Sequence, residues 1–436
     1  MNKKIEKNQN DGISSMTNLV SLYLNAKELQ DFVNNFSANP TSGLILNTYQ
    51  GEIEKTVNFL SSEYEKDTDD SLVYVFDKNE DRLGKTVEHA CGAFYILDPS
   101  SSVISFCMEK YLPKNFISFD LCAAPGGKTI AMAMRRKDGL YFCNDISFSR
   151  AIEIVKNTDR LGLSNVLTLS LDPMKIKEES LFDLIIADVP CSGSGMFRKE
   201  EKMLADWSVD KVKRLLPIQA NLLEKAYQMV KKNGIIAYST CSLSVEEDEE
   251  QVKSFLAKHE DLKLIEIEKR DGFVFSDSKI GVHLIPGVSK GEGIYFALIR
   301  KTGGRENQLT PVKGKEYSNG LISLPYRKNE YVVTRQYKEL QSYPFVSPGI
   351  KINDETEHPK CQYDHAFSKV CDNIPMLEVE RKDAVEYFKG NELTTSVDLK
   401  DGLYVITYNG YRLGFGKKVA KRIKNYLPKG LRSNLI

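Results

Sequence analysis

The chain has 436 residues, of which 41% are hydrophobic and 28% charged, and its formal net charge is zero. This composition is that of a globular protein of two or three domains, and a zero net charge excludes a general affinity for polyanions. No uncharged apolar run is long enough to span a membrane, and the polar first residues lack the apolar core of a signal peptide. We therefore expect a cytoplasmic protein without a membrane segment, in the simplest case a monomer.

The cysteines do not form a recognisable framework. There are 8 over the whole length, without any C-x-x-C pair. This is neither the density of a disulfide scaffold nor the spacing of a zinc site. We interpret them as reduced thiols, most of them buried, and predict no bound metal.

Residues 1–98 mix helix and strand signals. Apolar positions between Leu22 and Phe36 predict one helical face, and Leu44-Ile-Leu predicts a strand after Asn39-Pro40. Nothing in this region identifies chemistry by its spacing. We expect a small α+β region that contacts RNA.

The segment Phe116–Thr129 reads FISFDLCAAPGGKT. A run of β-formers, a small-residue turn and then strong helix formers predict a strand, a glycine turn and a helix, an arrangement that docks nucleotide-like ligands. A P-loop would need a glycine where Cys122 stands, and G-x-G-x-x-G is absent. By itself the segment leaves open an S-adenosylmethionine loop and a plain strand–helix connection.

Four further apolar runs follow, at intervals that admit a helix between them. Short continuous runs separated by helices predict a parallel sheet that is buried on both faces. We expect a doubly wound α/β domain over residues 99–302. The runs begin at Leu140, Val166, Leu184 and Ile235.

Acidic residues and cysteines follow these runs. Asp145, Asp172 and Asp188 come after the second, third and fourth strands, where carboxylates could meet a ribose or an adenine, or could merely cap helices. Cys191 and Cys241 follow the fourth and fifth strands, on the edge that carries the glycine turn. A single cysteine is usually a small core residue, but two beside a ligand loop indicate a site.

Three ordered motifs, DLCAAPGGKT, DVPCSGSG and YSTCS, resemble the Nop/Sun family of RNA cytosine-5 methyltransferases. With residues 84–99 and the GEGIYFA segment from Gly291, the resemblance extends to about Lys301. The GMFRK extension and the C-terminal region are similar to the bacterial branch that methylates small-subunit ribosomal RNA. The resemblance implies a Rossmann-like methyltransferase sheet that transfers a methyl group from S-adenosylmethionine to carbon 5 of cytosine in 16S ribosomal RNA, through a covalent cysteine adduct.

The resemblance also implies roles for individual residues. Cys241 would be the nucleophile, Cys191 would assist product release, and Asp188 would hydrogen-bond the cytosine ring near nitrogen 3. The other expected cofactor residues are Cys122, Ala123, Ala124, Pro125, Gly126, Gly127 and Lys128 for the methionine part, with Asp145, Asp172, Asp188 and Arg150. A salt bridge on its own helix is the alternative for Arg150.

Two neighbouring segments have open interpretations. Arg198 and Lys199 could contact RNA phosphates or be solvated. Ser244 and Glu247 have the spacing of a capping box, which favours a structural role for the acidic run that follows.

The C-terminal third begins with a polar linker, residues 303–325, followed by an appendage over residues 326–436. From Gly402 onward there are no acidic residues, and basic residues alternate with Tyr404, Tyr408, Tyr411, Phe415 and Tyr426. This pattern predicts a β-rich RNA-binding domain that acts by charge neutralisation and stacking, with a hairpin at Asn409-Gly410. The alternative is an ordinary basic surface.

Two other functions are compatible with the sequence. One is the same reaction on transfer RNA. The other is a ribosome-assembly RNA chaperone without turnover, which would need neither Cys191 nor Cys241.

Overall fold

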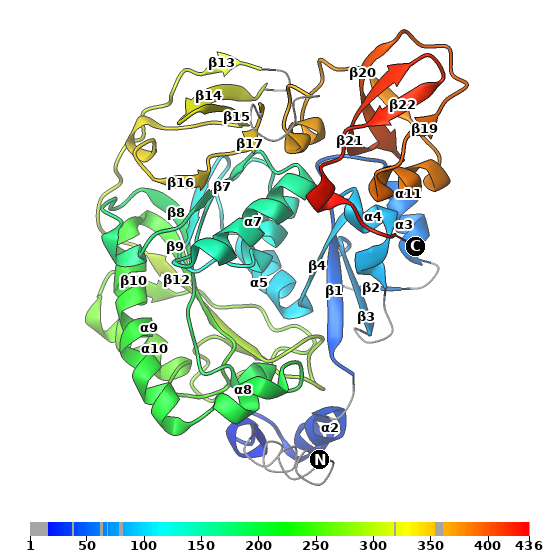
Figure 1. Cartoon of the computed structure of the whole chain (residues 1–436). Helices are drawn as coiled ribbons and strands as arrows, with labels where there is room; N and C mark the ends of the chain where they lie inside the picture. The colour runs from blue at the N-terminus through cyan, green and yellow to red at the C-terminus, as the bar shows by residue number, and fades with distance from the viewer. Residues whose placement is uncertain are drawn as a thin grey trace.

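The computed structural model describes residues 16–36, 39–61, 64–67, 69–77, 82–317, 320–353 and 361–435. The described strands form four sheets, and the largest of them lies at the centre of the molecule (Figure 1). No described helix combines the length and the apolar character needed to cross a bilayer.

The central sheet has the strand order β10-β12-β9-β8-β5-β6-β7-β16, with β11 paired to β12. The five strands expected from the apolar runs are all present and parallel, which confirms the doubly wound α/β prediction. They are β5 (Ile117–Asp120), β6 (Leu140–Asn144), β7 (Val166–Leu169), β8 (Phe182–Asp188) and β9 (Val230–Thr240). The antiparallel strands are β10 (Leu262–Leu264), β11 (Val282–Leu284), β12 (Ile294–Lys301) and β16 (Phe345–Ser347).

Alternate side chains of each strand enter different cores, as the two-residue period of a strand requires. Tyr141 and Cys143 pack with helices α5, α6 and α7 on one face. Leu140 and Phe142 pack with α9 and α10 on the other. The helices are α5 (Pro99–Glu109), α6 (Gly127–Arg135), α7 (Phe148–Leu161), α8 (Glu201–Asp206), α9 (Val209–Met229) and α10 (Glu249–Lys258).

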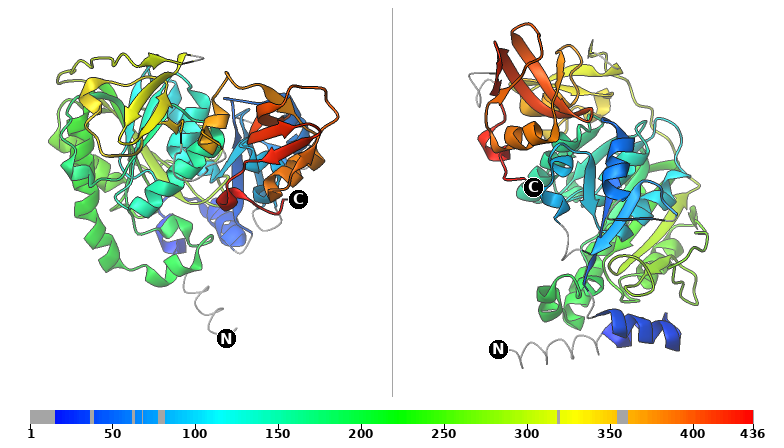
Figure 2. Two further views of the ribbon diagram at one scale, coloured as in Figure 1. Left: turned by 45° about the horizontal axis from the view of Figure 1, so that its top comes forward. Right: turned by 90° about the vertical axis from the view of Figure 1, so that its right-hand side faces the viewer.

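The two ends of the chain share a core. Leu44 and Tyr74 of the N-terminal sheet pack with Tyr387 of α11 and Ile423 of the C-terminal sheet, and the two sheets lie side by side in Figures 1 and 2. The N-terminal elements are α2 (Ala26–Phe36), β1 (Thr41–Leu46), α3 (Ile53–Ser61), β2 (Glu65–Lys66), β3 (Val73–Asp77), α4 (Val87–Ala90) and β4 (Phe94–Leu97). The C-terminal elements are β18 (Met376–Glu378), α11 (Arg381–Lys389), β19 (Leu393–Thr394), β20 (Gly402–Tyr408), β21 (Tyr411–Val419) and β22 (Arg422–Asn425).

A small sheet lies between these parts in the sequence. It contains β13 (Lys315–Glu316), β14 (Ile322–Tyr326), β15 (Asn329–Val333) and β17 (Ile350–Lys351). Residues 303–325, expected as a linker, thus contain β13 and most of β14, and β16 pairs with β7 of the central sheet. Short 3₁₀ turns complete the structure at Leu83–Lys85, Pro173–Lys175, Ser194–Met196, Lys338–Leu340, His365–Lys369 and Lys429–Leu431.

The predicted hairpin is present, because β20 and β21 pair across Asn409 and Gly410, both with positive φ. The stacking role predicted for the aromatic residues is wrong for three of them. Tyr404, Tyr411 and Phe415 are at most 6% exposed, because they fill the cores beneath the sheet. Basic side chains, in contrast, stay exposed: Lys417, Lys421, Arg422, Lys424, Lys429 and Arg432.

Candidate active site

The glycine turn joins β5 to α6 at the carboxyl edge of the central sheet. Gly126 precedes the helix with a φ of 106°, and a Cβ there would lie 2.9 Å from the Ile130 side chain. A larger residue would therefore be strained at this position. Arg150, from α7, donates to the carbonyl of Ala124 at 2.6 Å and pairs with Asp145 at 3.4 Å. Arg150 thus forms a salt bridge, although its partner Asp145 lies just before α7, and its role in cofactor binding stays a prediction.

The three predicted carboxylates differ in their surroundings. Asp145 is buried and accepts from the backbone N–H of Ser147 at 2.9 Å. Asp172 is half-buried and caps a 3₁₀ turn by accepting from Met174 N–H at 3.0 Å. Capping and ligand binding remain compatible for both residues, since each carboxylate has a second oxygen.

Asp188 connects the glycine turn to the two cysteine loops, which follow β8 and β9 and carry Cys191 and Cys241. Its carboxylate lies 2.7 Å from Nζ of Lys128 and accepts from the Ser239 hydroxyl at 2.7 Å. Burial, the largest single effect, lowers the pKa of Lys128, but the nearby negative groups, first Asp188 and then Asp120, together outweigh burial, so the net pKa is raised. Lys128 is therefore a buried cation that holds Asp188 in place.

Asp120 opens the DLCAAPGGKT motif and lies beside the turn, but it is not among the predicted site residues. It ends β5, is buried, and accepts from the Thr129 hydroxyl at 2.7 Å. Burial raises its pKa to about 7. Its place at the end of the strand that leads into the turn is the signal that could have identified it.

The two cysteines are brought into contact, with their Sγ atoms 2.7 Å apart. The backbone N–H of Cys241 also points at Sγ of Cys191, at 3.1 Å. The contact with Cys241, together with burial, raises the pKa of Cys191 well above its ordinary value. Cys191 is thus a protonated thiol directly beside a second sulfur.

Glu247 holds both cysteine loops. Its carboxylate accepts from the hydroxyls of Ser192 and Ser242, at 2.5 and 2.6 Å, and from the side chain of Gln219 at 2.9 Å. The predicted capping box is wrong, because Ser244 bonds the carboxylate of Glu246 instead. Packing between the two loops decides this outcome, since Glu247 supplies a buried acceptor to residues adjacent to both thiols.

The GEG segment, Gly291 to Gly293, packs against the loop that carries Cys191. Gly293 donates to the carbonyl of Gly195 at 2.9 Å, and a Cβ on Gly195 would lie 2.2 Å from the Gly293 carbonyl oxygen. Glu292, which lies between Gly291 and Gly293 in the sequence, pairs with Arg198 at 2.9 Å, and both side chains are buried. The phosphate-contact interpretation of Arg198 is therefore wrong. Lys199 instead pairs with Asp98 at 3.3 Å.

The chemistry available at this edge follows from these contacts. Two cysteine thiols, a carboxylate and a buried ammonium group lie next to a turn that presents backbone N–H groups. Such a set suits covalent catalysis with electrostatic stabilisation of a heterocyclic substrate. Exposed Ile146 and Phe148 add apolar surface beside Asp145.

Comparison with known families gives two matches. The family model "16S rRNA methyltransferase RsmB/F" matches residues 112–300. The model "Methyltransferase RsmF PUA domain" matches residues 375–433.

Curated relatives are similar over most of their length. "Ribosomal RNA small subunit methyltransferase F" of Aeromonas salmonicida is 27% identical over 80% of this chain and 81% of its own. The protein of the same name from Vibrio vulnificus is 29% identical over 81% and 82%. A solved methyltransferase homologue from Pyrococcus horikoshii is 25% identical, with a TM-score of 0.54 over 66% of this chain and 99% of its own.

Proposed function

The chain belongs to the RsmB/F family of 16S ribosomal RNA methyltransferases, and on this premise we propose that it methylates carbon 5 of a cytosine in small-subunit ribosomal RNA. The family assignment confirms the resemblance drawn from the sequence. The observation that carries the proposal is the contact between Cys191 and Cys241, 2.7 Å apart, beside the Lys128–Asp188 pair. An RNA-binding protein without turnover would need no such pair.

The thiolate of Cys241 adds to carbon 6 of the cytosine, forming an S–C6 bond and making carbon 5 nucleophilic. S-adenosylmethionine, when bound, supplies the methyl group that carbon 5 accepts. Nitrogen 3 takes up a proton from water as the adduct forms, and Asp188, held by Lys128, accepts a hydrogen bond from the resulting N–H and so stabilises the adduct. Loss of the carbon 5 proton to a base and cleavage of the S–C6 bond release the product, and the protonated thiol of Cys191 assists this release.

The glycine turn is the cofactor site in this proposal. Residues 122–128 hold the methionine part of the cofactor. Asp145 accepts hydrogen bonds from the ribose hydroxyls, and Asp172 accepts one from the amino group of adenine. Arg150 orients the turn through the Ala124 carbonyl. Ile146 and Phe148, which are 69% and 63% exposed, offer apolar surface to the nucleobase.

Ribosomal RNA is the proposed substrate because the relatives carry that substrate in their names. The exposed basic residues of β21, β22 and the C-terminal turn neutralise phosphates. The reactive cytosine must be unpaired or flipped out, because carbon 6 is otherwise stacked within the helix.

The test incubates the protein with radiolabelled S-adenosylmethionine and small-subunit ribosomal RNA, either free or in subunits. Wild type should form 5-methylcytosine, Cys241→Ala should form none, and Cys191→Ala should leave a protein–RNA adduct on a denaturing gel. Cys361→Ala, which removes a buried thiol in another core, is the matched control and should behave as wild type. Label in transfer RNA alone would identify transfer RNA as the substrate. No label in any RNA would favour an RNA chaperone without turnover.

A further inference from the structure

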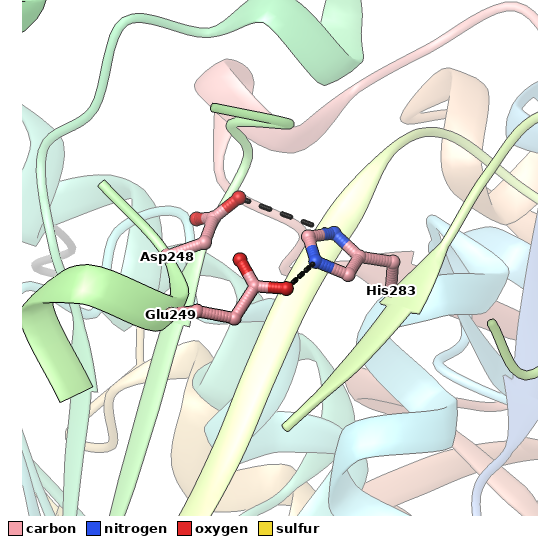
Figure 3. A group of neighbouring side chains, drawn as sticks. All are labelled: Asp248, Glu249 and His283. Atoms are coloured by element: carbon pink, nitrogen blue, oxygen red, sulfur yellow. Dashed lines mark hydrogen bonds and ion pairs between the residues drawn. The ribbon is translucent and has the colours of Figure 1, made fainter. Parts of the chain in front are cut away.

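A buried group of ionisable side chains lies directly behind the Cys241 loop. Asp248 and Glu249 stand at the start of α10, and His283 lies in β11 (Figure 3). Asp248 and His283 are fully buried, and Glu249 is 5% exposed. The mechanism above uses none of them.

The group is tied to the residues that flank the thiol. Asp248 accepts from the Thr240 hydroxyl at 2.6 Å, and the same hydroxyl oxygen accepts from the backbone N–H of Ser242 at 3.1 Å. Thr240 and Ser242 stand on either side of Cys241. The position of Asp248 therefore sets the backbone that carries the sulfur.

His283 is fixed from its other side. Its Nε2 lies 2.9 Å from Glu249, which also accepts from the Tyr23 hydroxyl at 3.3 Å. The Tyr23 ring covers the imidazole, with centroids 4.1 Å apart. Because Glu249 accepts, this contact assigns a proton to Nε2, and in a neutral ring Nδ1 is then an acceptor.

Nδ1 of His283 and Oδ2 of Asp248 face each other at 4.0 Å, and neither atom has a hydrogen-bond partner within the described parts of the chain. Two acceptors that face each other away from water are unfavourable, whereas a proton on Oδ2 makes them a donor and an acceptor. Burial, the largest effect, raises the pKa of Asp248 well above its ordinary value. The other ionisable groups around the pair are Tyr23, Tyr238, Cys241, Glu247, Glu249 and Tyr295.

A proton fits this arrangement better than a metal ion does. Glu249 contacts Nε2 of His283, whereas Asp248 faces Nδ1, so the two carboxylates lie beside different nitrogens of the same ring. A single ion could not replace both contacts.

We propose that Asp248 is a positioning residue for Cys241: as a neutral carboxylic acid it accepts from Thr240, turns its own proton toward Nδ1 of His283, 4.0 Å away, and so holds the loop that carries the thiol. This inference rests on the proposed function only for its effect on catalysis. The placement of the proton is a property of the folded chain and can be measured without turnover.

The decisive variants are Asp248→Asn and Asp248→Ala. An asparagine amide offers the same acceptor and donor as a protonated acid, so Asp248→Asn should keep kcat within about threefold of wild type. Asp248→Ala should lower kcat and the rate of Cys241 alkylation by about tenfold or more, with KM for RNA little changed. Equal losses in the two variants would overturn the proposal.

A spectroscopic measurement separates this inference from the proposed function. Nitrogen-15 spectra of histidine-labelled protein should show His283 protonated at Nε2 alone, in both wild type and Asp248→Asn. His283→Gln identifies its signals among the 5 histidines. A doubly protonated ring in wild type would overturn the proposal even if methylation is normal. So would a stoichiometric metal, found by elemental analysis of wild type and lost in Asp248→Ala.

Discussion

The cysteine loops and the proposed cofactor edge meet at the same end of the central sheet, yet the protein holds them differently. Around Cys191 and Cys241, the flanking Ser192, Thr240 and Ser242 are buried and bonded to the buried acids Glu247 and Asp248. At the cofactor edge, the side chains of Ile146, Phe148 and Arg150 are exposed. The geometry of the thiols is thus set by the protein itself.

The difference fits the function that we propose for each half. A covalent step needs two sulfurs in a fixed relation before the substrate arrives, because small displacements of a nucleophile are costly. A cofactor that enters and leaves with each turnover needs an accessible edge. Substitutions around the thiols should therefore cost stability, and those at the cofactor edge should cost mainly affinity.

The largest effect is expected for Glu247→Ala. The change leaves Ser192, Ser242 and Gln219 without their shared buried acceptor, so unfolding free energy should fall by about 4 to 5 kcal/mol. Urea unfolding measures this, with exposed Glu250→Ala as the control at about 0.5 kcal/mol or less. Equal losses of unfolding free energy in the two variants would contradict the idea that buried bonds of Glu247 fix the cysteine loops.

Asp120 tests whether protonation also contributes to stability at the cofactor edge. Because burial raises its pKa from 3.8 to about 7, the folded state keeps a proton that the unfolded state has already lost. Stability should therefore fall by about 3 kcal/mol between pH 5 and pH 8, and change no further above that range. Asp120→Asn should lack this contribution, and parallel pH profiles for the two proteins would contradict the prediction.

Gly195→Ala probes how closely the Cys191 loop meets the GEG segment. Its new Cβ would meet the Gly293 carbonyl at 2.2 Å, so the backbone must shift at a cost of about 1 to 3 kcal/mol. Thermal unfolding and the rate of thiol alkylation should both report the shift. Gly430→Ala is the matched control, because among the described residues only its chain neighbours could lie within 4 Å of the added Cβ.

The smallest effect on stability is expected for Arg150→Ala. Its side chain is 60% exposed, so the ion pair with Asp145 contributes about 0.5 kcal/mol or less. Loss of the bond to Ala124 should loosen the turn and weaken cofactor binding by about three- to tenfold. Calorimetry with S-adenosylhomocysteine measures the affinity, and an unchanged affinity would exclude Arg150 from the cofactor site.

Local signals in the amino-acid sequence were sufficient for the five parallel strands of the central sheet, the glycine turn, the hairpin and the presence of both thiols at one edge. These signals are apolar runs of strand length, glycine where φ is positive, and strand ends that coincide in a parallel sheet. The family motifs lie on the same local segments. For this reason the sequence alone identifies Cys191, Cys241, Asp188 and the turn as candidates.

The pairing of side chains over long distances depends instead on the tertiary fold. Glu247 has the spacing of a cap but bonds Ser192, and Arg198 resembles a phosphate contact but is buried against Glu292. Tyr411 fits a stacking surface, yet its hydroxyl bonds Thr56 at the opposite end of the chain. A local pattern records only that a residue is polar, charged or aromatic. Burial and the identity of the partner depend on segments that become neighbours only when the chain is folded.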